Sequence, residues 1–181
     1  MTARQQWGVV AAVVLLLGGA LWAATYVLRD ELFQVTVGAQ APAFQAVTLD
    51  QPRRERSISD YRGEVVLLNI WATWCAPCRE EMPSIQALHE RFAKQGLHVV
   101  AVSIDDPGSE AAIRDFAREY GLTFEILHDA SGAIQRQYQT TGVPETVVIG
   151  RDGTIRKKQI GHADWNSAPN QALVEALLAR R

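Results

Sequence analysis

The chain has 181 residues, of which 48% are hydrophobic, and a formal net charge of −2 at pH 7. This length fits one globular domain plus a short anchor, and the near-neutral charge argues against a nucleic-acid partner. The two cysteines are too few for a framework of several disulfides or for a zinc site of four cysteines.

Residues 7–28 form an uncharged, apolar segment near the N-terminus. As a helix of about 22 residues it would extend roughly 33 Å, enough to cross a bilayer. Arg4 precedes it and Arg29-Asp30-Glu31 follows, so the positive-inside rule places residues 1–6 in the cytoplasm and the rest outside. A cleaved signal peptide ending near Gly18-Gly19-Ala20 is the alternative. Both interpretations export the domain to a compartment where disulfides form.

Residues 29–37 are expected to form a linker, and residues 38–181 one domain with alternating strands and helices. The hydrophobic pattern predicts strands at 44–49, 53–58, 64–71, 97–104, 124–127, 146–149 and 154–160. It predicts helices at 76–94, 110–120 and 130–139, and a last one from 167 onward, with Pro83 kinking the first of them. This order predicts an N-terminal hairpin, a parallel core, one antiparallel edge after the last hairpin, and helices on both faces.

The cysteines stand as Cys75-Ala76-Pro77-Cys78, between a buried-strand pattern and a predicted helix. At a helix N-terminus, free backbone N–H groups and the helix dipole stabilise a thiolate. Cys75, at the exposed start of the helix, is the candidate nucleophile, and the more covered Cys78 would resolve the mixed disulfide. Pro77 suits the first helical turn, where no intrahelical N–H bond is lost. A purely structural disulfide is the alternative.

Three segments carry a resemblance to a known family. Residues 69–83 resemble the active-site stretch of membrane-anchored thioredoxin-like reductases of the ResA/TlpA/CcmG (DsbE) type. Residues 38–44 resemble the entry segment of the AhpC/TSA-like redoxin domain, and residues 142–146 resemble its cis-proline loop. The resemblance covers about residues 38–162. It implies an α/β, thioredoxin-like fold with an N-terminal β-hairpin extension and a central α/β insertion, preceded by one transmembrane helix.

The resemblance also implies a functional acid at Glu81, three residues after Cys78 on the same helix face. A partly buried carboxylate there could take the proton from Cys78 during exchange. Thioredoxins carry an aspartate six residues before the first cysteine, where this chain has Asn69, which cannot titrate. The acid–base role would therefore move to Glu81. The alternative is a solvated carboxylate on the helix surface.

The remaining candidate residues would bind the substrate. The resemblance implies a cis peptide between Val143 and Pro144, in a loop that packs on the disulfide and pairs with an extended client segment. The alternative is an ordinary trans turn. Glu145 either contacts the client or is solvated. Trp74 and Pro77 would form an apolar rim for docking, whereas Trp71 is expected in the core.

These observations predict a protein-disulfide reductase that works through Cys75 and Cys78 without a metal or an organic cofactor. The resemblance implies a transmembrane thiol carrier of the CcdA/DsbD type as electron donor. It also implies clients such as the disulfide of apocytochrome c or a copper-site cysteine pair of an oxidase. The expected location is the cell membrane, in a single pass, with the catalytic domain in the periplasm or on the outer face.

Three other activities stay open at this point. A chaperone could hold Cu(I) on the thiolates of Cys75 and Cys78, although no Met- or His-rich motif accompanies them. A peroxidase is suggested by the wider superfamily, but the Pro and the Thr or Ser that it needs upstream are replaced by Leu68 and Ala72. An oxidant of the DsbA type would use the same Cys-x-x-Cys chemistry in the opposite direction.

Overall fold

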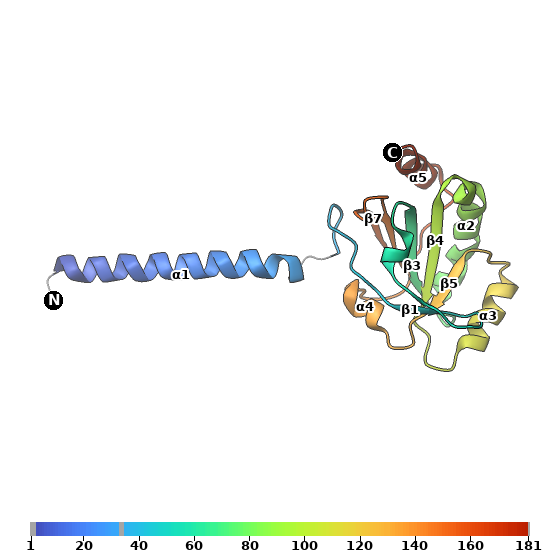
Figure 1. Cartoon of the computed structure of the whole chain (residues 1–181), viewed down its shortest axis with the longest axis horizontal. Coiled ribbons are helices and arrows are strands. Elements are labelled where there is room, and N and C mark those ends of the chain that lie inside the picture. Colours follow the sequence, from blue (N-terminus) through green and yellow to red (C-terminus); the bar gives the residue numbers. More distant parts are fainter. Residues whose placement is uncertain (1–2, 33–34, 181) are drawn as a thin grey trace. The chain divides into compact units, whose positions relative to one another are not determined.

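The computed structural model describes residues 3–32 and 35–180, which fall into two compact units divided after Gln34. The first unit holds α1 (Ala3–Leu32), a continuous helix (Figure 1). Its segment Gln5–Thr25, with a mean hydropathy of 2.1, could cross a membrane by length and composition. The linker predicted at 29–37 is too long, because the helix continues to Leu32 and Val35 already packs in the core of the domain.

The domain is built on one seven-stranded sheet with the order β2-β1-β5-β4-β3-β6-β7 (Figure 1). The strands are β1 (Ala46–Thr48), β2 (Glu55–Arg56), β3 (Val65–Trp71), β4 (Leu97–Ser103), β5 (Glu125–His128), β6 (Glu145–Ile149) and β7 (Ile155–Ile160). Strands β3, β4 and β5 are parallel, which confirms the predicted core. Antiparallel strands flank it on both sides, not on one, because the N-terminal hairpin joins the sheet by pairing β1 with β5.

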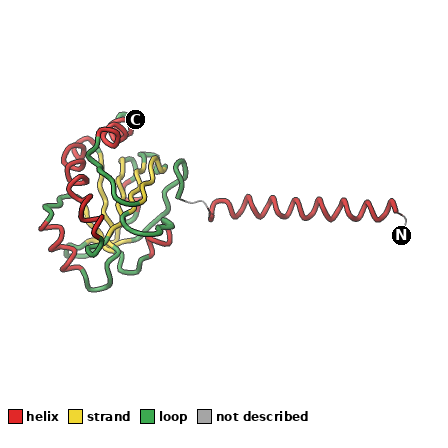
Figure 2. Tube along the Cα trace, turned by 180° about the vertical axis from the view of Figure 1, so that it is seen from behind, coloured by secondary structure: helices red, strands yellow, loops and turns green. Residues whose placement is uncertain are grey.

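Helices cover both faces of the sheet, as predicted (Figures 1 and 2). They are α2 (Ala76–Phe92), α3 (Glu110–Glu119), α4 (Ala133–Gln137) and α5 (Ala168–Leu178), with 3-10 turns η1 (Ile58–Tyr61) and η2 (Ala93–Gln95). One face buries Ile85 of α2, Phe116 of α3 and Leu177 of α5. The other buries Ile134 of the short α4. Between β4 and β6, where the central α/β insertion is expected, the chain forms α3, β5 and α4.

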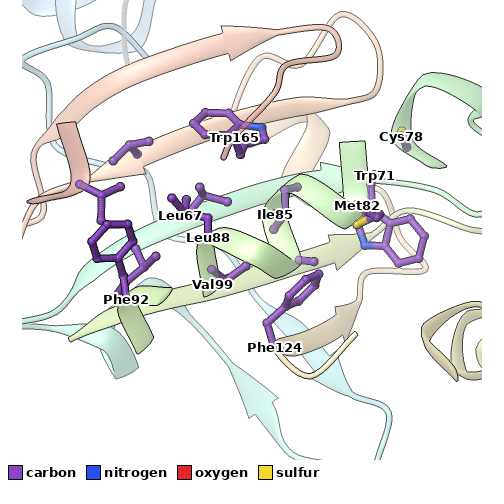
Figure 3. Close-up of a cluster of buried hydrophobic side chains, with 14 of the residues drawn as sticks. Leu67, Trp71, Cys78, Met82, Ile85, Leu88, Phe92, Val99, Phe124 and Trp165 are labelled. Atoms are coloured by element: carbon purple, nitrogen blue, oxygen red, sulfur yellow. The ribbon is translucent and has the colours of Figure 1, made fainter. Parts of the chain in front are cut away.

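Helix α2 carries the cysteine motif and is fixed by its apolar stripe. Met82, Ile85, Leu88 and Phe92 recur every three or four residues and are buried with Leu67 and Val99 of the sheet (Figure 3). The helix runs through Pro83 as one element. Pro83 has no N–H to donate to the Arg79 carbonyl, one turn earlier in the helix. Both residues are exposed, so water can satisfy that carbonyl.

The register of the sheet gathers four connections at one end of the domain. Trp71, the last residue of β3, pairs with Ser103, the last residue of β4. Ile70 pairs with Glu145, the first residue of β6, which in turn pairs with Ile160 at the end of β7. The segments after β3, after β4, before β6 and after β7 therefore meet, and the cysteine motif begins in the first of them.

Candidate active site

Cys75 and Cys78 are joined by a disulfide at the first turn of α2. Cys75 is the N-cap residue, and its Sγ accepts a hydrogen bond from the Cys78 backbone N–H at 3.1 Å. The Val143 carbonyl oxygen lies 3.5 Å from the same sulfur. Cys78 is fully buried, as predicted, but Cys75 is only 4% exposed and so is less open than predicted. The difference arises because the disulfide holds Cys75 against the Val143 loop.

Two tryptophans precede the cysteine motif, and one is buried while the other is exposed. Trp71 is fully buried, with its ring centroid 4.7 Å from that of Phe116 in α3, which confirms its place in the core. Trp74 is 67% exposed, and Pro77 is also exposed. The surface next to the disulfide is therefore apolar and open to a macromolecule.

Glu81 is a buried carboxyl group, not the solvated one of the alternative. Its Oε1 accepts a hydrogen bond from Asn69 Nδ2 at 2.8 Å, and its Oε2 accepts one from the Ala163 N–H at 3.3 Å. Burial raises the pKa of Glu81 to about 7, against the smaller opposing effect of these hydrogen bonds. A group with this pKa can both take and release a proton near neutral pH.

Asn69 connects this acid to the sheet. Its Nδ2 also donates to Thr146 Oγ1 of β6 at 2.8 Å, so one amide links β3, α2 and β6. Sequence reasoning noted that Asn69 cannot titrate but missed Thr146. The signal was available, since Thr146 follows the proline loop directly in a strand that is otherwise apolar after Glu145.

The Val143–Pro144 peptide is cis, as expected, and Pro144 is buried. The loop is anchored by the Pro144 carbonyl, which accepts a hydrogen bond from the Gly161 N–H at 2.8 Å. Val143 is half-buried, so part of it faces outward beside the sulfur.

Glu145 differs from both sequence expectations, because its side chain is fully buried. Its Oε1 lies 3.1 Å from Lys158 Nζ of β7, forming an ion pair in which Lys158 is 19% exposed. Burial raises the pKa of Glu145, and the Lys158 ammonium opposes that rise. A solvated carboxylate is excluded, and no part of this side chain is exposed for a client to contact. Glu145 therefore supports the loop from beneath.

Sequence reasoning also missed Asp105, which is 3% exposed just beyond β4. Its carboxylate accepts hydrogen bonds from Thr73, two residues before Cys75. The pattern offered a signal, since Asp105 follows a buried strand at the end where the parallel strands finish. Within residues 3–32 and 35–180, no group of three or more His, Cys, Asp or Glu side chains could hold a metal ion.

Comparison with known proteins agrees with this geometry. Residues 37–158 match the model of the AhpC/TSA family. The thiol-disulfide oxidoreductase ResA of Geobacillus thermodenitrificans is 37% identical over 158 residues, covering 85% of this chain and 87% of the relative. The thioredoxin-like protein YneN of Bacillus subtilis is 35% identical over 158 residues, covering 87% and 91%.

Solved structures show the same fold. A protein from Chlorobium tepidum described as a thiol:disulfide interchange protein DsbE superposes with a TM-score of 0.71 at 27% identity, covering 80% of this chain and 99% of that one. StoA of Bacillus subtilis superposes with a TM-score of 0.58 at 24% identity, covering 75% and 96%. The chain belongs to the AhpC/TSA family, and it is a thiol-disulfide oxidoreductase of the ResA/CcmG type with Cys75 and Cys78 as its cysteine pair.

Proposed function

We propose that the domain is an exported, membrane-tethered reductant of protein disulfides, with Cys75 attacking and Cys78 resolving. One observation carries this assignment: the Cys75–Cys78 pair begins a helix, with the Cys78 N–H directed at the Cys75 sulfur. The same N–H would stabilise the Cys75 thiolate after reduction. A thiolate stabilised in this way is the sulfur able to attack a client disulfide.

The reaction is two successive thiol–disulfide exchanges. The Cys75 thiolate attacks one sulfur of a client disulfide, forming a mixed disulfide and releasing the other client sulfur as a thiolate. The Cys78 thiolate then attacks Cys75 Sγ, which breaks the mixed disulfide and releases the second client sulfur. Two electrons pass to the client, and the Cys75–Cys78 disulfide is formed. The two protons lost by the cysteines end on the client thiols.

Glu81 would handle the proton of Cys78. Cys78 is fully buried, so its thiol needs a nearby base before it can attack. Glu81 follows it by one helical turn, and its pKa of about 7 lets it accept that proton and release it later. Asn69 holds Glu81 Oε1 in place through its side-chain N–H.

The client would dock on Trp74 and Pro77 and run past the Val143–Pro144 loop. Trp74 and Pro77 are exposed, and part of Val143 is accessible next to the Cys75 sulfur. A polypeptide carrying a disulfide between close cysteines in an extended segment, such as apocytochrome c, suits this surface. Pro144 and Glu145 contribute by fixing the loop, because their side chains are buried.

The N-terminal helix would serve as the tether, with the domain on the outer face of the membrane or in the periplasm. The helical segment Gln5–Thr25 has the length and composition for this. In an oxidising compartment the Cys75–Cys78 pair must be reduced again after each turnover. A transmembrane thiol carrier of the CcdA/DsbD type fits that need. The tether would keep the domain at the same membrane as the carrier and so raise the effective concentration of the carrier at the active site.

A trapping experiment tests the assignment. In Cys78→Ala the mixed disulfide on Cys75 cannot be resolved, so the variant, expressed in the cell membrane, should accumulate a client that thiol reagents release. Cys75→Ala is the matched control and should trap nothing. Equal trapping by both variants, or none by either, would contradict the assigned roles.

A further inference from the structure

The segment before Cys75 is a tight turn held from below by one carboxylate. The Cys75 N–H donates to the Ala72 carbonyl at 3.2 Å, which closes a turn with Thr73 and Trp74 at its centre. The Thr73 N–H donates to Asp105 Oδ2 at 3.0 Å, and the Thr73 hydroxyl donates to Asp105 Oδ1 at 2.6 Å. Asp105 thus binds the residue that begins the bend leading to the nucleophile.

Asp105 is itself firmly anchored. The hydroxyl of Ser103, the last residue of β4, donates to Asp105 Oδ2 at 2.6 Å and accepts from the Asp105 N–H at 3.1 Å. The Asp105 carbonyl lies 2.8 Å from His128 Nε2 of β5. Asp105, Ser103 and His128 are all at most 5% exposed. Hydrogen bonds to a charged acceptor in such a site are short and strong.

We propose that Asp105 is a positioning residue for the exchange reaction: by clamping Thr73 it fixes the 72–75 turn and so holds Cys75 Sγ against the Cys78 N–H. This inference rests on the proposed role of Cys75 as the attacking sulfur. Among the residues that the structure describes, the Cys78 N–H is the only group that donates a hydrogen bond to Cys75 Sγ. If the turn shifts, the distance of 3.1 Å lengthens and the thiolate loses its stabilising donor.

The chain provides a matched pair of substitutions that separates positioning from general stability. Thr73→Val removes the hydroxyl bond to Asp105 on the active-site side and keeps the side-chain shape. Ser131→Ala removes a hydroxyl bond of the same length, from Ser131 to Asp129 Oδ1 in the loop after β5, which is not part of the clamp. Both should lower the melting temperature, but only Thr73→Val should disturb the sulfur. Thr73→Ser restores the hydroxyl and should restore the behaviour.

The measurement uses the full chain in detergent and has two readouts. In a Cys78→Ala background, where Cys75 is the sole thiol, the rate of alkylation is recorded against pH. In the intact dithiol protein, kcat/KM is measured for reduction of insulin disulfides. We expect Thr73→Val to slow alkylation at pH 7 by about threefold, with its midpoint at higher pH. We also expect it to lower kcat/KM about tenfold. Ser131→Ala should stay within about twofold of the parent in both readouts.

The outcomes distinguish the clamp from the function on which it rests. Equal effects of Thr73→Val and Ser131→Ala, or no shift of the alkylation midpoint in Thr73→Val, would overturn the clamp. If Thr73→Val does not fold, Thr73→Ala removes the same hydroxyl with less bulk and is judged by the same criteria. A parent protein that reduces no disulfide refutes the proposed function, and the alkylation readout still decides whether Asp105 positions Cys75.

Discussion

Glu81 should make the stability of the domain fall as pH rises through neutrality. Burial raises its pKa from 4.5 to about 7, so the folded state holds this proton more tightly than the unfolded state does. Between pH 4.5 and 7 the unfolded chain therefore binds fewer protons, and the free energy of unfolding decreases with pH. The full effect, about 3 kcal/mol, follows from 1.36 kcal/mol per pKa unit.

Glu81→Gln removes this titration and keeps an acceptor for Asn69. At pH 4.5 the variant should be less stable than the parent by the cost of placing an amide N–H opposite the Ala163 N–H. Above pH 8 the variant should be the more stable by about 3 kcal/mol, less the cost of placing an amide N–H opposite the Ala163 N–H. Urea unfolding of the oxidised full chain in detergent, followed by tryptophan fluorescence at both pH values, measures the difference.

Glu80→Gln is the control, because Glu80 is the exposed neighbour on the same helix and its substitution should leave the pH dependence unchanged. If the free energies of unfolding of the parent and Glu81→Gln changed in parallel with pH, the reasoning would be refuted. That result would show that Glu81 does not titrate between pH 4.5 and pH 8. The same substitution should remove the inflection near pH 7 from kcat/KM for disulfide reduction.

Three further substitutions test other parts of the structure. His98→Gln should lower the melting temperature most at pH 5.5, because a hydrogen bond to Glu125 raises the pKa of His98. The stabilisation by His98 is complete below about pH 6.5 and is lost above the raised pKa. A decrease in melting temperature that is the same from pH 5.5 to 8.5 would contradict this prediction. Lys158→Met should lower the free energy of unfolding by about 3–5 kcal/mol at pH 7, because it leaves the Glu145 carboxylate unpaired, and by less at pH 4. An unchanged urea midpoint at pH 7 would exclude a charged Glu145. Trp74→Ala should raise KM for a protein disulfide about tenfold with the melting temperature unchanged, and an unaltered KM would remove Trp74 from the docking surface.

The local pattern was sufficient to predict most of the fold. The apolar runs at 64–71 and 97–104 correspond to β3 and β4, and the spacing of Met82, Ile85 and Leu88 fixed the buried face of α2. What the pattern missed depends on pairings between distant strands. The second antiparallel edge exists because Val47 and Thr48 pair with β5, some 80 residues later in the chain.

The candidate site likewise contains residues that could be identified from the sequence and residues whose state depends on strand pairing. Cys75 and Cys78 could be identified from their spacing, and Glu81 from the family resemblance together with its offset from Cys78 on the helix. The state of Glu145 could not, because its burial and its ion pair with Lys158 depend on the β6–β7 register. A lysine at 158 looks like an exposed edge residue in isolation. Asp105 was missed for a related reason: its partner Thr73 is brought within reach only by the parallel pairing of β3 with β4.

The central claim is that Cys75 and Cys78 cycle between dithiol and disulfide. The direct test equilibrates the full chain in detergent with defined redox buffers and counts free thiols by alkylation and mass. We predict a single two-electron transition in which both cysteines react together, within the range of about −300 to −120 mV that spans thioredoxin-like couples. A pair that remains oxidised, or remains reduced, across that whole range would contradict the account.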